Sequence, residues 1–263
     1  MPRIALCQLT TGAEPAANLD LVREWTARAA AEGARVVVFP EATMAGFGVP
    51  LGPLAEPLDG PWATAVAAVA AEHDVLVVAG MFTPAGDRVR NTLLVTGLGE
   101  HRGYDKIHLY DAFGFKESHT VAPGDSIATV KVDETVLGLA TCYDVRFPSL
   151  FHKLAEAGAS AVLLPASWGA GEGKREQWEL LVRARALDSG SWVLACDQAD
   201  PAVTGVSVNP KAPTGIGYST VADPFGRVHA QLAADADLLV VDIDPALSTT
   251  SREATAVLPN RRV

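Results

Sequence analysis

Cysteine is scarce in this sequence, and so are the features typical of membrane or nucleic-acid binding. The three cysteines, Cys7, Cys142 and Cys196, lie far apart and lack the CxxC or Cys/His spacing of a zinc site. No uninterrupted apolar run approaches the ~18–20 residues that a membrane span needs. No dense Lys/Arg block occurs, and the formal net charge is −10, which argues against a nucleic-acid or anionic-membrane partner. We therefore expect a protein of the reducing cytoplasm without a bound metal.

The chain also lacks internal repeats, low-complexity tracts and any long Pro- or Ser-rich linker that would mark a domain boundary. Residues 1–15 contain too short an apolar stretch for a signal peptide and are more typical of a first strand. The hydrophobic content of 49% over 263 residues is enough for a sizeable core. We expect one domain over residues 1–263, with the polar residues 245–263 as a tail that docks on the domain or on a partner subunit.

The chain does contain a regular alternation of short apolar runs and Ala-rich amphipathic segments. The apolar runs are typical of strands covered on both faces, and they occupy residues 3–9, 35–40, 74–82, 91–97, 135–141, 160–167, 191–198, 217–224 and 237–244. Apolar residues recur at helical spacing in residues 16–33, 61–73, 147–158 and 173–189. Two strand runs within 74–98 have no helix between them, which indicates a hairpin. The sequence therefore predicts an α/β fold with two mixed sheets faced by helices.

Cys142 ends one of these apolar runs, in the stretch GLATCYDVRFP (138–148), and a segment with helical periodicity follows it. A thiol there would lie at the carboxyl end of a strand, near a helix amino terminus that favours the thiolate. Ligands of α/β sheets also collect outside strand carboxyl ends. From these residues alone, a nucleophile and a small core residue are equally good interpretations. Cys7 and Cys196 lie inside apolar runs and fit buried structural thiols.

A cysteine nucleophile needs a base, and no single residue identifies it. None of the six histidines stands out, although His108 in DKIHLY is a candidate for a papain-like pair. Glu41 directly follows VVVFP, where apolar strands would partly desolvate its carboxylate and suit it to proton transfer. A turn or helix-capping carboxylate is the commoner case for a lone glutamate. Lys106 lies among apolar and aromatic residues, as a cation that stabilises an oxyanion would, but a solvated surface lysine is the commoner case.

Taken together, three segments resemble, in order and in residue type, the signature segments of the nitrilase superfamily of carbon–nitrogen hydrolases: FPEATMAG, YDKIHLYDAFGFKES and LATCYDVRFPSLF. The resemblance places the family's catalytic glutamate, lysine and cysteine at Glu41, Lys106 and Cys142. It extends over essentially the whole chain through PASW at 165–168, RARALDSG at 183–190, VADPFG at 221–226 and NRR at 260–262.

The resemblance implies a four-layer αββα sandwich and a mechanism without metal or organic cofactor. In that mechanism Glu41 takes the thiol proton and Cys142 attacks the carbonyl carbon of a small-molecule amide. The ammonium of Lys106 and the backbone N–H of Tyr143 hold the oxyanion. Glu41 then protonates the leaving amine, which leaves a thioester, and activates the water that releases the acid.

Further residues receive roles from the same resemblance. Glu117, in GFKES, is similar to the family's second glutamate, which would orient Lys106 and the departing ammonia; a surface glutamate is the alternative. Ser167 and Trp168 occupy positions that line the family's substrate pocket. Asp144 and Arg146 fit either an ion-paired structure behind the nucleophile or a substrate contact.

Within the superfamily, the chain most resembles the branch of ω-amidases and deaminated-glutathione amidases, which act on small carboxylate-bearing amides. It departs from that branch at Tyr218, where a histidine is common, and in GAGEGKREQW (169–178), which replaces an aromatic, His-containing form. A homodimer or a higher homo-oligomer is implied by the family. Three alternatives remain open: a nitrile hydrolase working through a thioimidate, an N-carbamoyl amidohydrolase, and a catalytically silent binding or scaffold protein on the same fold.

Overall fold

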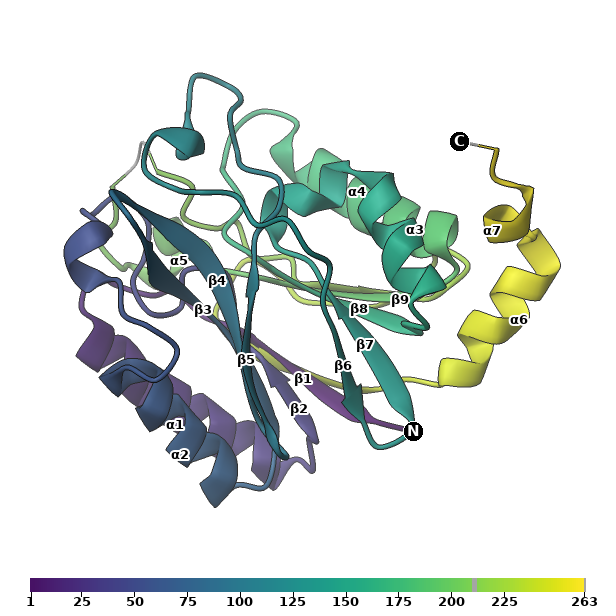
Figure 1. Ribbon diagram of the computed structural model, residues 1–263, viewed down its shortest axis with the longest axis horizontal. Coiled ribbons are helices and arrows are strands. Elements are labelled where there is room, and N and C mark those ends of the chain that lie inside the picture. The colour runs from purple at the N-terminus through teal and green to yellow at the C-terminus, as the bar shows by residue number, and fades with distance from the viewer. Residues whose placement is uncertain (210–211, 263) are drawn as a thin grey trace.

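The computed structural model describes residues 1–209 and 212–262 and contains two mixed six-stranded sheets packed face to face (Figure 1). Helices α1 (Pro15–Ala31) and α2 (Pro61–Glu72) cover the outer face of the first sheet. Helices α3 (Pro148–Glu156) and α4 (Lys174–Ser189) cover the outer face of the second. The order of layers is therefore helix, sheet, sheet, helix, which confirms the predicted αββα sandwich.

Both sheets combine parallel and antiparallel pairs. In spatial order, the strands of the first sheet are β12 (Asp237–Asp242), β1 (Arg3–Gln8), β2 (Val36–Val38), β3 (Leu76–Ala85), β4 (Arg88–Gly97) and β5 (Glu100–Asp105). Those of the second are β11 (Val228–Gln231), β10 (Thr220–Ala222), β9 (Trp192–Asp197), β8 (Ala161–Ala166), β7 (Thr135–Leu139) and β6 (Thr129–Val132). Strands β1–β3 and β7–β9 are parallel, and all other pairs are antiparallel.

Shorter elements connect these strands and helices. They are the 3-10 turns η1 (Gly52–Leu54), η2 (Glu117–His119) and η3 (Cys142–Arg146), and the helices α5 (Pro201–Thr204), α6 (Pro245–Thr255) and α7 (Val257–Asn260).

Three strands were not predicted from the sequence: β5, β6 and β11. All three are edge strands, and each has exposed or half-exposed side chains along its length. An edge strand has a partner on one side only and is covered incompletely, so it needs no continuous apolar run. The apolar runs therefore identify the inner strands and, among the edge strands, only β12, whose run 237–244 is apolar.

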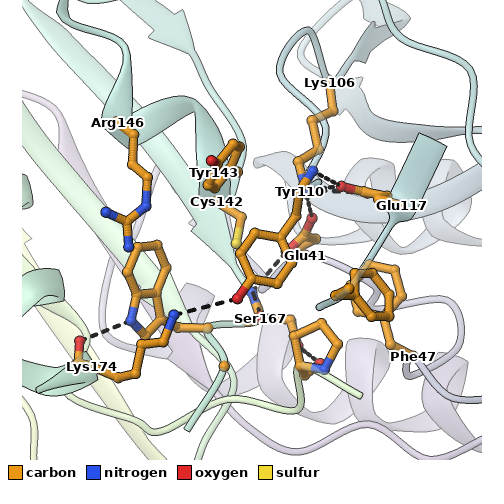
Figure 2. Close-up of a pocket in the computed structure, with 14 residues that line it drawn as sticks. Glu41, Phe47, Lys106, Tyr110, Glu117, Cys142, Tyr143, Arg146, Ser167 and Lys174 are labelled. Atoms are coloured by element: carbon orange, nitrogen blue, oxygen red, sulfur yellow. Dashed lines mark hydrogen bonds and ion pairs between the residues drawn. The ribbon is translucent and has the colours of Figure 1, made fainter. Parts of the chain in front are cut away.

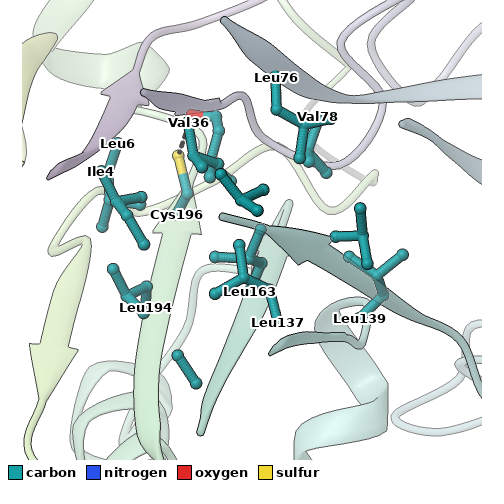
Figure 3. Packing of buried hydrophobic residues seen from close by; sticks show 14 of the residues in the cluster. Ile4, Leu6, Val36, Leu76, Val78, Leu137, Leu139, Leu163, Leu194 and Cys196 are labelled. Carbon is teal, nitrogen blue, oxygen red and sulfur yellow. Dashed lines mark hydrogen bonds between the residues drawn. The ribbon is translucent and has the colours of Figure 1, made fainter. Parts of the chain in front are cut away.

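The central core lies between the two sheets (Figure 3). Successive side chains of a strand point to opposite faces, so Ile4 and Leu6 enter this layer while Ala5 and Cys7 face the helices. From the second sheet, residues such as Leu163 pack against them. Full burial of each such side chain contributes about 1.5–3 kcal/mol. The two sheets are thereby held in one relative position, which is what allows residues from both to form one site.

Helix α6 docks beside the second sheet through hydrogen bonds to backbone carbonyls. Arg252 donates from Nε to the carbonyl of Ser189 and from Nη2 to the carbonyl of Ala159 and the hydroxyl of Ser191. Ser251 donates to the carbonyl of Pro224 at 2.8 Å. Arg252 therefore connects α6 to the two turns that precede the neighbouring parallel strands β8 and β9.

Replacement of Arg252 should destabilise the protein. In Arg252→Ala the carbonyls of Ala159 and Ser189 lose a charged donor, so the free energy of unfolding should fall by about 1–3 kcal/mol. Urea denaturation measures the change. Glu253→Ala, an exposed site on the same helix, is the control and should change stability little; an equal effect of both substitutions would contradict the assigned role.

Candidate active site

The three catalytic residues proposed from the sequence lie together at one edge of the sandwich (Figure 2). Glu41 follows β2 of the first sheet, Lys106 follows β5, and Cys142 begins η3 immediately after β7 of the second sheet. All three line one pocket. The site therefore lies where the ends of strands from both sheets meet, as is usual for ligand sites of α/β proteins.

The carboxylate of Glu41 is buried and held by three donors. Its Oε1 accepts hydrogen bonds from Lys106 Nζ at 2.9 Å and from Asn91 Nδ2 at 2.7 Å. Its Oε2 accepts from the backbone N–H of Ser167 at 2.9 Å. Only 1% of the Glu41 side chain surface is exposed. These donors fix the orientation of the carboxylate, and the Ser167 N–H joins it to the second sheet.

The backbone at Glu41 lies directly over β3, and this close approach requires glycine. A Cβ added to Gly80 would lie 2.4 Å from the Ala42 nitrogen and 2.9 Å from the carbonyl carbon of Glu41. Any side chain at Gly80 would therefore displace Glu41. Ala42 itself has a left-handed backbone, with φ of 59°. The turn that presents the carboxylate is thus specified by a residue of another strand, which no local sequence pattern indicates.

Lys106 lies between two carboxylates. Its Nζ donates to Glu41 Oε1, and to Oε2 and Oε1 of Glu117 at 3.0 and 3.2 Å. Desolvation acts to lower the pKa of Lys106, but the charges of Glu117 and Glu41 outweigh it, and the pKa is raised above its ordinary value. Glu117 also accepts the Tyr110 N–H at 2.6 Å. Lys106 is therefore a permanent, fixed cation, and Glu117 is a buried partner of it rather than a surface residue.

Cys142 occupies a strained turn. Its φ is 45°, in the left-handed region that non-glycine residues rarely adopt. The thiol donates a weak hydrogen bond to the carbonyl of Ser167, with Sγ 3.9 Å from the oxygen. The chain then makes the 3-10 turn η3 before α3 begins at Pro148. The α-helix amino terminus is therefore not adjacent to the sulfur.

The protonation state of Cys142 differs from the expectation based on a helix dipole. Burial, followed by the charge of Glu41, raises the pKa of the thiol well above its ordinary value, although Lys106 acts in the opposite direction. The predicted stabilisation of the thiolate was wrong, because desolvation and a nearby carboxylate outweigh the positive groups. The resting group is a thiol, so attack requires a base that removes its proton.

Asp144 supports the nucleophile turn from behind. Its buried carboxylate accepts the Thr141 N–H at 2.9 Å, the Tyr104 hydroxyl at 2.7 Å and the His108 N–H at 3.0 Å, and it shares a 2.7 Å hydrogen bond with His108 Nδ1. The Asp144 side chain therefore connects the lysine segment to the cysteine segment. Since His108 is held by Asp144, the geometry favours Glu41, and not His108, as the base.

The pocket around Cys142 encloses about 400 Å³ of empty space, its open mouth included. The expected binding residues Tyr143, Ser167 and Trp168 line it. Residues not selected from the sequence complete the lining: Phe47, Tyr110, Phe115, Gly169, Lys174 and Pro213. Lys174 belongs to the segment 169–178, whose departure from the ω-amidase branch pointed to this neighbourhood but not to the side chain. Phe47 lies in a Gly- and Pro-rich loop between β2 and α2.

Two cations face the pocket on the side away from Lys106. Figure 2 shows Arg146 and Lys174 on one side of Cys142, with Lys106 and Glu117 on the other. Arg146 donates to the Gln177 side-chain oxygen at 2.7 Å and lies over the Trp168 ring, with Cζ 5.2 Å from the centroid. The pKa of Lys174 is lowered by desolvation and by the charge of Arg146. Among the described residues, neither cation has a carboxylate within ion-pair distance.

Two negative findings apply to residues 1–209 and 212–262. No three His, Cys, Asp or Glu side chains in these ranges gather in a way that could hold a metal ion. No helix there is long and apolar enough to cross a membrane.

Asp197, at the end of β9, supports the segment that carries Ser167. Its Oδ1 accepts the Trp168 N–H at 2.8 Å and its Oδ2 accepts the Ile216 N–H at 2.9 Å. Complete burial raises the pKa of Asp197 to about 7, although its backbone hydrogen bonds act against this. The Asp197 carboxyl group therefore changes its charge near neutral pH. It does so next to the segment whose Ser167 N–H binds Glu41.

The raised pKa of Asp197 predicts a pH-dependent stability. Between about pH 4 and 7 the folded state keeps a proton that the unfolded state has lost, so stability should fall as pH rises, by up to about 1.4 kcal/mol per unit. Urea denaturation at several pH values in this range gives the slope of the unfolding free energy against pH. This slope should be smaller in Asp197→Asn than in the wild type. The exposed Asp125→Asn is the control and should keep the wild-type slope; a full slope in Asp197→Asn would refute the assignment.

Comparison with known proteins gives consistent results. The carbon-nitrogen hydrolase family model matches residues 3–253. The hydrolase Rv0480c of Mycobacterium tuberculosis is 53% identical over 266 residues, which cover 98% of this chain and 95% of that protein. The omega-amidase NIT2 of Mus musculus is 31% identical over 274 residues, covering 99% and 95%.

A solved structure agrees with the sequence comparisons. A mutant of the amidase from Nesterenkonia sp. AN1, in complex with butyramide, superimposes with a TM-score of 0.79 at 27% identity, covering 97% of this chain and 95% of that one. The family model spans nearly the whole chain, and both relatives match over almost their full lengths. The chain belongs to the carbon–nitrogen hydrolase family of the nitrilase superfamily.

Proposed function

We propose that this protein is an amidase that releases ammonia from a small, carboxylate-bearing amide through a thioester on Cys142. The observation that carries the proposal is the position of the Glu41 carboxylate, which binds the Lys106 ammonium, lines the same pocket as Cys142 and raises the pKa of its thiol. One residue can therefore move the proton, and its neighbour can stabilise the negative charge that develops on the substrate.

In the first step, Glu41 removes the thiol proton while Cys142 attacks the amide carbon. The raised pKa of the thiol makes this transfer necessary, since little thiolate is present at rest. Lys106 and Glu117 remain charged beside Glu41. Before transfer, the two carboxylates and the ammonium carry a net charge of about −1, and this falls to about zero when Glu41 accepts the proton.

The oxyanion of the tetrahedral intermediate forms beside Lys106 and the backbone N–H of Tyr143, which follows the nucleophile in the turn. Cys142 and Tyr143 both line the pocket, and the left-handed backbone of Cys142 joins them in a tight turn. Loss of one oxyanion donor typically costs about 2.7–4 kcal/mol of transition-state stabilisation. Because Glu117 and Glu41 hold the ammonium in place before substrate arrives, it needs no rearrangement during the reaction.

The carbon–nitrogen bond then breaks as Glu41 returns its proton to the departing amine, which leaves as ammonia. Glu41, again ionised, activates a water molecule that attacks the thioester. The second tetrahedral intermediate collapses to the free acid, and the sulfur takes back a proton from Glu41. Each half-reaction therefore uses the same carboxylate once as a base and once as an acid.

The substrate class follows from the charge of the pocket. Arg146 and Lys174 are partly buried in the pocket lining, lack a carboxylate partner among the described residues, and lie on the side away from the reacting atoms. A buried cation without a counter-ion is costly, so a substrate carboxylate would complete this end of the site. The similarity to an omega-amidase supports the same class of substrate.

The nucleophile and base are tested by ammonia release from a panel of small amides and nitriles. Cys142→Ala should abolish release, and Glu41→Gln should lower kcat by about 10²–10⁴-fold, because both half-reactions need the transferred proton. Cys7→Ala and Cys196→Ala are matched controls at buried thiols outside the pocket and should alter stability only. Full activity of Glu41→Gln would reject the mechanism, and release from nitriles alone would favour a nitrile hydrolase.

The carboxylate-binding end is tested with a pair of amides of equal length, one with a terminal carboxylate and one neutral. Arg146→Ala and Lys174→Ala should each lower kcat/KM for the anionic amide by about 10- to 100-fold through lost charged hydrogen bonds, and should affect the neutral amide little. Arg175→Ala, an exposed neighbour paired with Glu179, is the control. Equal losses on both amides would show that the two cations are structural.

A further inference from the structure

Asn91 is the third residue that contacts the Glu41 carboxylate, and the reaction scheme above gives it no part. It lies on β4 and is 1% exposed. Its Nδ2 donates to Oε1 of Glu41 at 2.7 Å and to Oε1 of Glu117 at 3.2 Å. Its backbone carbonyl accepts the N–H of Lys106 at 2.9 Å. Asn91 thus contacts both carboxylates of the site and the backbone, but not the ammonium, of Lys106.

The side-chain oxygen of Asn91 does not take part in the hydrogen bonds within the site. Asn91 Oδ1 is buried and has no hydrogen-bond partner within the described part of the chain. An unsatisfied buried acceptor destabilises the folded protein, and an apolar side chain of similar shape would avoid that cost. The amide orientation is determined by its neighbours, because only the NH₂ group can face two carboxylate oxygens.

We infer that Asn91 is a positioning residue for proton transfer: a neutral double donor that keeps Glu41 ionised and aimed at the Cys142 thiol. A neutral donor is required because of the charge balance. Glu41 and Glu117 share the single cation Lys106. A second cation in place of Asn91 would stabilise the carboxylate so strongly that it would be a poor base. An apolar residue would leave the carboxylate less stabilised, so that it would hold its proton to higher pH.

The other charged groups that face Glu41 are accounted for. They are Lys106 after β5, Glu117 in η2, Cys142 in η3 and Asp197 at the end of β9. The contribution of Asn91 can therefore be isolated only by changing it while these groups stay unchanged.

This inference rests on the proposed role of Glu41 as the base, and the experiment separates the two. The rate at which iodoacetamide alkylates Cys142 is measured against pH by peptide mass spectrometry, in the wild type, Glu41→Gln, Asn91→Ala, Asn91→Asp and Thr92→Val. Alkylation needs no knowledge of the natural substrate. If Glu41 is the base, the wild-type rate falls at low pH as Glu41 is protonated, and Glu41→Gln removes this acid limb.

In Asn91→Ala the fall of the alkylation rate at low pH should move to higher pH by about one unit. At a given pH within that fall, Cys142 should therefore be alkylated about tenfold more slowly than in the wild type. Asn91→Asp keeps the volume but adds a third carboxylate, so its limb should move at least as far. The amidase reaction of Asn91→Ala should show a lower kcat with little change in KM, since the residue does not line the pocket.

Thr92→Val is the matched control. Thr92 is the next residue of β4, equally buried at 1% exposure, and its hydroxyl donates to Asp105 Oδ1 at 2.6 Å instead of to the charged cluster. It should lower thermal stability without moving the acid limb. If both Asn91 variants also keep the wild-type limb, Asn91 is merely structural and the inference is overturned. If Glu41→Gln keeps the limb, the proposed function fails instead.

Discussion

The ammonium of Lys106, shared between the carboxylates of Glu41 and Glu117, is the interaction on which the site depends. All three side chains are nearly inaccessible to water. Without the ammonium between them, two buried carboxylates this close together would repel each other strongly. Removal of one member of a buried ion pair typically costs about 3–5 kcal/mol. Lys106 therefore holds the two glutamates together and, in the proposed mechanism, also provides the positive charge that stabilises the oxyanion.

The fold supplies that cluster with fixed attachment points from both sheets. Glu41 follows a strand of the first sheet, and its second oxygen is bound by the Ser167 N–H, which follows a strand of the other. Asp144 joins the lysine segment to the nucleophile turn in the same way. Since the apolar layer between the sheets cannot slide without opening voids, the distance between base and nucleophile is set by core packing far from the chemistry.

The pocket has a division of charge that matches its proposed use. The reacting end combines two carboxylates with one ammonium. The opposite end carries Arg146 and Lys174 beside aromatic rings. A substrate with an amide at one end and a carboxylate at the other can satisfy both ends, whereas a neutral amide leaves the two cations without a counter-ion.

The sequence alone determined the architecture, because buried strands need apolar runs, and it was enough to propose Glu41, Lys106 and Cys142 as a catalytic trio, because the segments around them are long enough to be characteristic. It could not reveal the edge strands β5, β6 and β11, the requirement for Gly80, or the contacts of Asn91. The raised pKa of the Cys142 thiol was missed for the same reason. Each of these depends on atoms brought close by packing between segments distant in the chain, and only the tertiary structure decides burial and distance, on which the electrostatics of the site depend.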